Sequence, residues 1–250
     1  MAGTALPGQL KWWTGDVTRI VRETATASSL ILNVPGWLGH RAGQHVDVRL
    51  AAEDGYQAVR SYSIASAPAD DQLMLTIERL DDGEVSPYLV DGVRPGDPLE
   101  LLGPIGGYFV WETVMASPLL LIAGGSGVVP LRAMARQRAR TNSEVPVRFL
   151  YSARTADALI YRAELDALAA SDRRFDLTYT LTRSQLPDWS GYARRVDAEM
   201  LREVAWAPED DPSIYLCGPT TFVEVVADHL VALGHDPASI RIERFGPTGM

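Results

Sequence analysis

Residues 119–130 read Leu-Leu-Leu-Ile-Ala-Gly-Gly-Ser-Gly-Val-Val-Pro, an apolar run followed at once by a glycine-rich turn. An unbroken apolar run of this kind is typical of a buried strand in a parallel sheet. Gly124, Gly125 and Gly127 let the backbone turn tightly and approach a ligand closely. Pro130 suits the first turn of a following helix, where free N–H groups favour a phosphate. The stretch predicts a strand–turn–helix unit with a phosphate site, and a tight turn without a ligand is the alternative.

The chain beyond this stretch alternates apolar strands with helical patterns. Strands are predicted at residues 147–151, 176–181, 213–217 and 240–245, and helices at 131–140, 158–170, 198–204 and 221–233. Alternation of this kind indicates a parallel sheet that is covered by helices on both faces. We therefore expect an α/β domain over residues 115–250.

The chain before the stretch has a different rhythm. Short β-rich segments lie at residues 17–21, 30–34, 45–50, 60–64, 73–80 and 99–102, and turn residues such as Pro35-Gly36 separate them. A short helix is predicted at residues 86–90. Many short strands at this spacing favour an antiparallel barrel, which we place at residues 12–114. The predicted fold is thus a two-domain β plus α/β protein.

The composition excludes several classes of protein. The net charge of −9 argues against nucleic acid as a partner, and no apolar run approaches the ~20 residues that span a bilayer. Cys217 is the only cysteine, so a disulfide within the chain, a four-cysteine iron–sulfur centre and a cysteine zinc site are excluded. The four histidines form no metal-ligand pattern, and we expect no metal. The first ten residues lack a secretory signal, which predicts a cytoplasmic protein.

Two further segments carry residues suited to ligand binding. Arg60, Tyr62 and Ser63 offer a phosphate-binding fork, a flat aromatic face and a hydroxyl, but an ordinary strand with a core tyrosine is the alternative. Cys217 ends a predicted parallel strand, where ligands bind in α/β sheets, although a buried free cysteine is more often a small apolar side chain.

The order of the motifs resembles that of the ferredoxin–NADP reductase family. The motifs are Arg60-Ser-Tyr-Ser63, Gly83-Glu-Val-Ser86, Gly103-Pro-Ile-Gly106 with Phe109, Gly124 to Pro130, Tyr151-Ser-Ala-Arg-Thr155, Leu159-Ile-Tyr161, Cys217-Gly-Pro219 and Glu243 with Phe245. The likeness covers nearly the whole chain, from about residue 14 to residue 245. Each motif is weak alone, but their ordered set is specific.

The resemblance implies a flavin site. Arg60 would contact the FAD pyrophosphate, Tyr62 would lie against the isoalloxazine, and Ser63 would bond near N5. Gly83, Val85 and Ser86 would hold the pyrophosphate, and Phe245 would cover the flavin. Glu243 would act as a proton relay or charge partner, and a plain edge strand is the alternative for this C-terminal segment.

The resemblance also implies a site for NAD(P)H, formed by Gly124, Gly125, Gly127, Arg154, Cys217, Gly218 and Pro219. Cys217 would lie beside the nicotinamide C4 and position the ring. Thr182, Arg183, Tyr192 and Arg194 resemble the 2′-phosphate site of NADPH-specific members, since arginine forks and hydroxyls suit a dianionic phosphate. We therefore expect NADP(H), and NAD(H) stays possible because Asp188 and Asp197 lie close by in sequence.

The implied protein is a monomeric flavoprotein reductase with a six-stranded Greek-key FAD barrel and a parallel-sheet nucleotide domain. It would transfer hydride from NAD(P)H to FAD N5 and pass electrons to a separate acceptor, such as a ferredoxin or an oxygenase component. One alternative is a diaphorase or free-flavin reductase. Another is a non-catalytic flavin-binding regulatory subunit.

Overall fold

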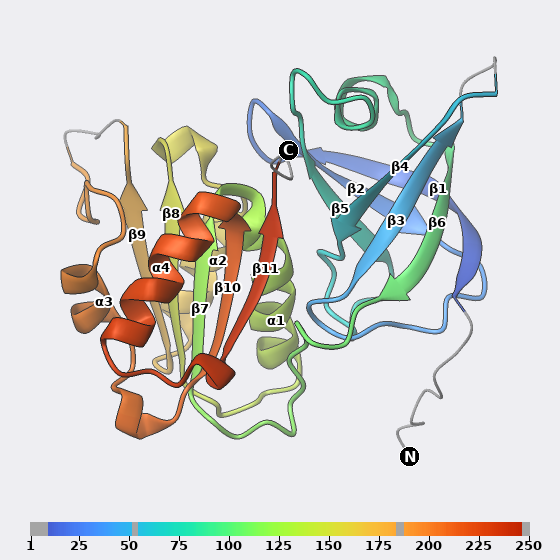
Figure 1. Ribbon diagram of the computed structural model, residues 1–250. Coiled ribbons are helices and arrows are strands. Elements are labelled where there is room, and N and C mark those ends of the chain that lie inside the picture. Colours follow the sequence, from blue (N-terminus) through green and yellow to red (C-terminus); the bar gives the residue numbers. More distant parts are fainter. Residues whose placement is uncertain (1–9, 52–54, 184–187, 247–250) are drawn as a thin grey trace.

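The computed structural model describes residues 10–51, 55–183 and 188–246, which form two sheets lying side by side (Figure 1). The first sheet is antiparallel and has six strands in the order β4-β3-β6-β1-β2-β5. Its strands are β1 (Lys11–Arg22), β2 (Ala27–Asn33), β3 (His45–Ala51), β4 (Gln57–Ser63), β5 (Leu73–Glu78) and β6 (Pro98–Ile105).

The two edge strands of this sheet meet, and the sheet thereby curls into a barrel. Ile64 and Leu75 form an antiparallel bridge, and the Ala65 N–H donates to the Met74 carbonyl at 2.7 Å. Alternate residues of the strands point inward, as Leu99 and Leu101 of β6 do. The predicted six-stranded antiparallel barrel is confirmed.

Several barrel elements differ from their predicted bounds, and β1 differs most. β1 begins six residues earlier than expected, because Lys11 to Asp16 pair with β6. The short helix predicted at residues 86–90 is helical from residue 86 to residue 92, and its last five residues form the π-helix η1 (Tyr88–Gly92), in which the Val93 N–H donates to the Tyr88 carbonyl at 3.0 Å. Pro87 lies in the first turn of this segment, and its missing N–H and fixed φ suit a helix start.

The second sheet is parallel and has five strands in the order β11-β10-β7-β8-β9. Its strands are β7 (Leu119–Gly124), β8 (Val147–Ala153), β9 (Phe175–Leu181), β10 (Ser213–Pro219) and β11 (Ile240–Phe245). The helices are α1 (Val128–Arg140), α2 (Arg162–Ser171), α3 (Ala198–Val204) and α4 (Thr220–Ala232), with short turns η2 (Gly125–Gly127), η3 (Ala156–Ala158), η4 (Pro208–Asp210) and η5 (Pro237–Ser239).

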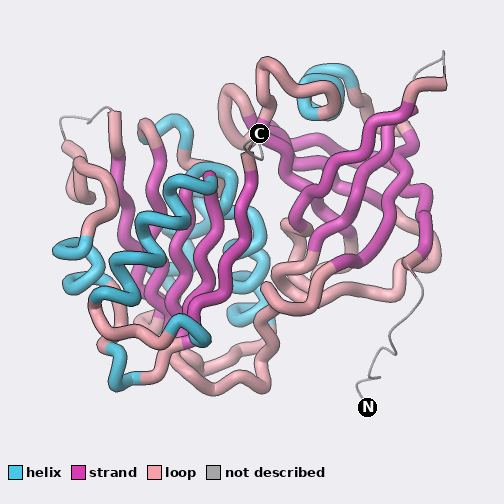
Figure 2. The backbone as a smooth tube through the Cα atoms, in the orientation of Figure 1, coloured by secondary structure: helices cyan, strands magenta, loops and turns pink. Residues whose placement is uncertain are grey.

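Helices cover both faces of the parallel sheet, as the sequence predicts (Figure 2). Leu119 and Leu121 belong to the apolar cluster on the side of α1 and α2, whereas Leu120 and Ile122 belong to the cluster on the side of α3 and α4. Every residue of β7 is buried, which explains why this strand is an unbroken apolar run.

The helix predicted at residues 158–170 begins only at Arg162. Tyr161 precedes it with φ 60° and ψ 20°, a left-handed conformation that stops a right-handed helix from extending backwards. The Ile160 N–H donates instead to the Tyr151 hydroxyl at 3.1 Å. Tertiary contacts therefore override the helical pattern of residues 158–161.

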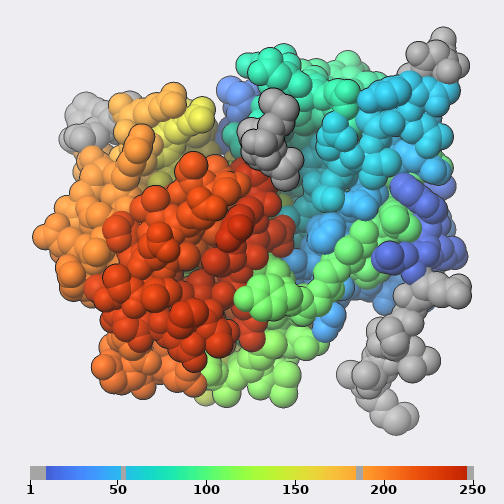
Figure 3. Space-filling model, viewed as in Figure 1, coloured from blue at the N-terminus to red at the C-terminus, as the bar shows by residue number. Residues whose placement is uncertain are grey.

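The barrel and the parallel sheet share one apolar cluster, to which Ala42, Ala65 and Trp111 contribute from the first half of the chain. The Tyr215 hydroxyl of β10 also donates to the Val110 carbonyl at 2.7 Å. α1 and β11 are the elements of the second half that face the barrel in Figure 1. In the space-filling view the cyan surface of the barrel and the red surface of the C-terminal segments lie side by side (Figure 3).

Candidate functional site

The glycine-rich turn lies directly against the end of strand β10. A Cβ atom on Gly127 would lie 2.1 Å from the Cys217 carbonyl oxygen, so only glycine lets the turn approach β10 this closely. Gly124 and Gly218 both pack against the ring of Phe222. The predicted nucleotide residues Gly124, Gly127, Cys217 and Gly218 are thus brought together.

Gly125 has a different environment from its neighbours. Its φ of +55° is left-handed, and no atom lies within 4 Å of the position that a Cβ would take. α1 begins three residues later, and among the described contacts no side chain caps its N-terminus. The start of a helix beside open space fits a phosphate of a nicotinamide nucleotide, because the helix dipole favours negative charge there. Pro130 lies in the first turn of α1, as predicted.

Cys217 is buried, with 1% of its surface exposed, and lies between Ala123 of β7 and Glu243 of β11 in the sheet register. Residues that are register partners in adjacent parallel strands point to the same face. Burial raises the pKa of the Cys217 thiol well above its usual range, and the nearby Glu243 carboxylate raises it further. The thiol is therefore protonated at neutral pH, which suits a packing role and not a nucleophile.

Ser63 and Glu243 join the two halves of the molecule. The Ser63 hydroxyl at the end of β4 donates to the Glu243 carboxylate at 2.9 Å, across 180 residues of sequence. Burial raises the pKa of Glu243, and the Ser63 hydrogen bond opposes that shift. Since Cys217 is the register partner of Glu243, the three residues predicted to be catalytic gather at one place.

The remaining predicted flavin residues of β4 point to different surroundings. Tyr62 is half-buried against the barrel core, and burial raises the pKa of its hydroxyl to about 12. Arg60 is exposed and its guanidinium pairs with Glu84 at 2.6 Å. Tyr62 and Ser63 are neighbours on β4 whose side chains point to opposite faces of the strand, and Arg60 has to leave Glu84 in order to bind a pyrophosphate.

The predicted pyrophosphate loop is held by hydrogen bonds between its own residues. The Gly83 N–H donates to the Leu80 carbonyl at 2.9 Å, and the Val85 side chain is buried in the barrel core. The Ser86 hydroxyl accepts from the Leu80 N–H at 3.0 Å, which leaves its own hydrogen able to donate to a ligand. The Gly83 N–H is therefore not available to a phosphate while this turn is formed, contrary to the expected role.

Phe245 lies at the end of β11 as the register partner of Pro219. Its ring is half-buried against the apolar cluster that contains Cys217. Gly246 follows with φ +118°, a backbone conformation that favours glycine. The predicted position of Phe245 over the flavin stays a prediction, and the last four residues lie outside the described part of the chain.

The four residues predicted to bind the 2′-phosphate divide into two groups. Thr182 and Arg183 form one group and lie beside Arg154 of the predicted NAD(P)H site, because the Arg183 N–H donates to the Arg154 carbonyl at 2.9 Å and the Thr182 N–H to the Ala153 carbonyl at 3.0 Å. Tyr192 lies beside the end of β9, where the Leu181 N–H donates to its carbonyl at 2.9 Å.

Arg194 is already engaged by acidic side chains. It lies over the Tyr192 ring and forms ion pairs with Asp197 at 3.0 Å and Glu199 at 3.4 Å. The Tyr192 hydroxyl donates to Glu203 of α3. Of the two predicted arginines, Arg183 is thus the better placed for a phosphate.

The sequence motifs do not include Arg132, a charged residue whose guanidinium donates to the Ala65 carbonyl of the barrel at 2.7 Å. Its side chain is 3% exposed and lies in α1 among apolar residues. An arginine inside such an apolar run is the signal that could have identified it, since a buried charge needs partners.

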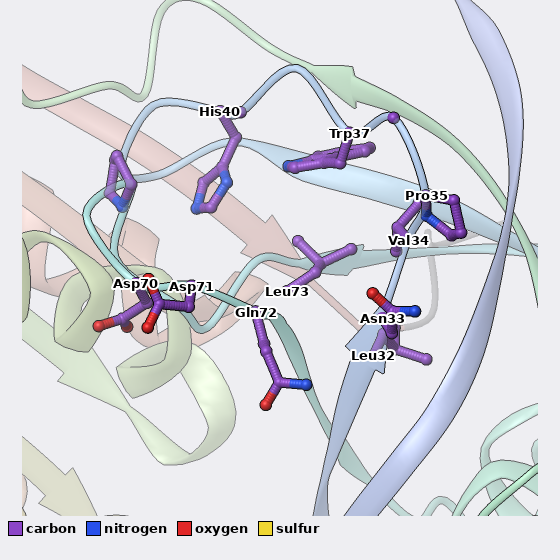
Figure 4. A pocket seen from close by; sticks show the side chains of 13 residues that line it. Leu32, Asn33, Val34, Pro35, Trp37, His40, Asp70, Asp71, Gln72 and Leu73 are labelled. Carbon is purple, nitrogen blue, oxygen red and sulfur yellow. The ribbon is translucent and has the colours of Figure 1, made fainter.

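A pocket of about 340 Å³ lies in the barrel between the loop after β2 and the segment before β5. Figure 4 shows the rings of Trp37 and His40 on one wall and Leu73 and Gln72 on another. Burial lowers the pKa of His40, whose Nε2 lies 3.0 Å from the Ser66 carbonyl oxygen. Its lining contains none of the residues predicted to bind FAD or NAD(P)H, so the pocket lies apart from the candidate site.

Two features are absent from the part of the chain that the structure describes. Over residues 10–51, 55–183 and 188–246, no three His, Cys, Asp or Glu side chains are grouped so that they could hold a metal ion. Over the same ranges no helix combines the length and the apolar character that crossing a membrane requires.

Two family models match the chain, one for each half. The oxidoreductase FAD-binding domain family matches residues 16–110, and the oxidoreductase NAD-binding domain family matches residues 121–228. Among solved structures, the FAD/NAD-binding domain of nitric oxide dioxygenase from Vibrio cholerae superposes with a TM-score of 0.84 at 28% identity. The superposition covers 94% of this chain and 99% of that one.

Curated relatives agree with the family models. The glycine betaine monooxygenase reductase subunit of Pseudomonas aeruginosa is 34% identical over 83% of this chain, which spans only 57% of that protein. Ferredoxin–NADP reductase B of Sorangium cellulosum is 36% identical over 82% of this chain and 84% of its own length. With its FAD-binding barrel and its NAD-binding parallel sheet, the chain therefore belongs to the ferredoxin–NADP reductase family.

Proposed function

We propose that this protein is a flavoprotein reductase that takes hydride from NAD(P)H onto FAD and passes the electrons to a separate acceptor. The observation that carries the proposal is the Ser63–Glu243 hydrogen bond at 2.9 Å with Cys217 alongside. It joins the end of a barrel strand to the carboxyl ends of the parallel strands, where ligands of α/β sheets bind. Bound FAD supplies the redox chemistry, because it accepts a hydride and releases electrons to the acceptor.

The residues of the chain hold and orient the two cofactors. Tyr62 and Ser63 would hold the flavin ring, and the turn at Gly125 would hold a phosphate of the nicotinamide nucleotide. Cys217 would lie beside the nicotinamide C4 and help to position the ring. Glu243 has a raised pKa in a half-buried position, so its carboxyl can hold a proton beside the Ser63 hydroxyl at a higher pH than an exposed glutamate can.

The acceptor is proposed to be a ferredoxin or an oxygenase component. The Pseudomonas relative is named as the reductase subunit of a monooxygenase, and the Sorangium relative as a ferredoxin–NADP reductase. The domain limits at residues 12–114 and 115–250, the monomeric state and a cytoplasmic location remain predictions.

Purification and anaerobic mixing test the proposal. We expect the protein to purify yellow, and its flavin absorbance to bleach when NADPH or NADH is added without oxygen. Flavin that is lost on gel filtration but reduced in the mixture would favour the diaphorase or free-flavin reductase. Tightly bound flavin that neither nucleotide reduces would favour the regulatory subunit. A protein that stays colourless in excess FAD would overturn the proposal.

The preference for NADPH depends on Arg183. Replacing Arg183 by alanine should raise the Kd for NADPH by about tenfold, or about 1.4 kcal/mol, and leave the Kd for NADH unchanged, because only NADPH has a 2′-phosphate for the guanidinium. Titration of the flavin-loaded protein with NADP+ and NAD+, which differ by the same 2′-phosphate, measures this difference between the two nucleotides.

Arg194→Ala is the matched control, since that guanidinium is already paired with Asp197 and Glu199. Its effect on NADPH should be smaller than that of Arg183→Ala. An equal loss for NADPH and NADH in the Arg183 variant would contradict the assignment of a 2′-phosphate site to this residue.

A further inference from the structure

Arg132 is a buried charge at the junction between the barrel and the parallel sheet. Its Nη1 donates to the Ala65 carbonyl of the barrel at 2.7 Å and approaches Met74 Sδ at 3.7 Å. Its Nε and Nη2 donate to one carboxylate oxygen of Glu164 in α2, at 3.1 and 2.5 Å. The guanidinium therefore ties two helices of the second half to one peptide of the barrel.

That peptide lies two residues beyond Ser63. The Ala65 N–H is bonded within the barrel to the Met74 carbonyl at 2.7 Å, and the Ile64 N–H is bonded to the Gln44 carbonyl at 2.9 Å. With its carbonyl held by Arg132, Ala65 is fixed from both halves of the molecule. Any shift of α1 relative to the barrel has to stretch or break the bond to Ala65.

Tyr161 makes a second bond across the same junction. Its ring lies under the Arg132 guanidinium, 4.6 Å from the ring centre, and its buried hydroxyl donates to Thr76 Oγ1 of β5. Thr76 is in turn bonded to Ser29 at 2.7 Å, and Ser29 donates to Glu23 at 2.6 Å. We call Arg132, Tyr161 and Glu164, with their barrel partners Ala65 and Thr76, the junction cluster.

The other end of α1 leads directly to the glycine turn. α1 starts at Val128, immediately after Gly127, which packs against the Cys217 carbonyl. Arg132 is the fifth residue of this helix, so a short rigid segment connects the turn to the end of β4. The positions of Ser63 and of Cys217 are thereby set relative to one another through Arg132.

We propose that Arg132 is a positioning residue for hydride transfer: it fixes the flavin-binding end of β4 against the nucleotide-binding turn. The proposal rests on the proposed function, because the two sites matter to each other only if both cofactors bind. Transfer needs the reacting atoms at near-contact distance, and a misplacement of about 1 Å costs about 100-fold in rate. Arg132 touches neither site and acts through Ala65 and α1.

Arg132→Met in the flavin-loaded full chain tests the proposal. The limiting rate of flavin reduction by NAD(P)H should fall by about tenfold or more, while the Kd for the nucleotide stays within about twofold. Glu164 keeps an ion pair with Arg136 at 3.0 Å, so the substitution does not leave it without a cationic partner. Arg132→Lys, which keeps one donor for Ala65, should recover part of the rate.

Tyr161→Phe is the second variant. It removes only the hydroxyl that reaches Thr76 and should slow the same step more mildly, so it carries the test if Arg132→Met does not fold. Arg140→Gln is the control, because Arg140 pairs with Asp70 at 3.3 Å at the exposed rim of the same contact. Its limiting rate should match that of the wild type.

Reactivity of the single cysteine gives a readout that does not depend on turnover. Cys217 is buried beside Glu243, whose other partner is Ser63 of the barrel. Labelling by a thiol reagent should be faster in Arg132→Met and Tyr161→Phe than in the wild type, and unchanged in Arg140→Gln.

Wild-type limiting rates in both Arg132→Met and Tyr161→Phe would overturn the proposal. So would a slower reaction that is due entirely to weaker nucleotide binding. If NADPH and NADH fail to reduce even the wild type, the proposed function is wrong, and thiol labelling alone then shows whether Arg132 fixes the junction.

Discussion

Replacing Ser63 by alanine should slow reduction of the bound flavin by about 100-fold, the usual cost of removing one donor from a reacting centre. Ser63 Oγ lies at the end of β4 and donates to Glu243 at 2.9 Å. The variant loses a hydroxyl at the place where the two cofactors would meet. Tyr62 and the barrel core are untouched, so the flavin content should stay near that of the wild type. Anaerobic stopped-flow mixing with NAD(P)H measures the rate, and absorbance measures the flavin content.

Ser61→Ala is the matched control on the same strand. Ser61 lies two residues earlier on the same face of β4, and its hydroxyl donates to Asp47 at 2.5 Å and not to Glu243. It should reduce at the wild-type rate. If Ser63→Ala also reduces its flavin at the wild-type rate, Ser63 has no part in hydride transfer.

The periodicity of the sequence predicts the strands and helices correctly where the local apolar pattern agrees with the burial of the side chains. The apolar run at Leu119–Gly124 is the central strand of the parallel sheet, and its neighbours β8 and β10 were predicted for the same reason. The prediction from periodicity is wrong at Tyr161. The helical pattern is interrupted there, because the Tyr161 hydroxyl is bonded to Thr76 of the barrel. No local pattern records a partner 85 residues away.

The candidate site depended on resemblance more than on pattern. Ser63, Cys217 and Glu243 lie far apart in the chain, and residue types alone gave each of them an ordinary structural alternative. The order of their motifs along the chain resembles that of a known family, and this resemblance indicates one shared site. In the structure, the register of β10 with β11 and the Ser63–Glu243 hydrogen bond bring the three residues together.

Electrostatic partners were the least predictable feature. Asp197 is close to Arg194 in sequence, so the sequence indicates that it can compete with a phosphate for this arginine. Glu199 and Glu203 belong to the same helix, α3, and the fold brings them to Arg194 and Tyr192. Arg60 pairs with Glu84, which lies 24 residues later. A charge pattern therefore shows which residues can bind a phosphate, whereas the fold decides which of them is already paired.

Gly127→Ala should lower the rate of flavin reduction by NAD(P)H by about 100-fold, because the turn has to move away from β10 by roughly 1 Å or more. A Cβ would lie 2.1 Å from the Cys217 carbonyl oxygen, a backbone atom that cannot swing aside. The same overlap should lower the free energy of unfolding by about 1–3 kcal/mol. Thermal unfolding and stopped-flow reduction of the same preparation measure the two effects.

Gly125→Asn separates nucleotide binding from stability at the neighbouring position. Asparagine tolerates the left-handed backbone, and nothing lies within 4 Å of its Cβ, so the unfolding temperature should change little. The side chain would project into the open space where we place the nucleotide phosphate, and the Kd for NAD(P)H should therefore rise. The same substitution at Gly96, a barrel glycine with φ +99° and equally open surroundings, is the control for nucleotide binding and should leave the Kd for NAD(P)H unchanged.

The three glycine variants together distinguish a phosphate site from a tight turn without a ligand. A turn needed only for packing would lose stability in Gly127→Ala, but Gly125→Asn would then bind NAD(P)H as the wild type does. A phosphate site predicts that Gly125→Asn binds the nucleotide poorly while it keeps its flavin and its unfolding temperature. Since the open space beside Gly125 is the structural basis for placing a phosphate there, unaltered nucleotide affinity in this variant would remove the phosphate from the turn.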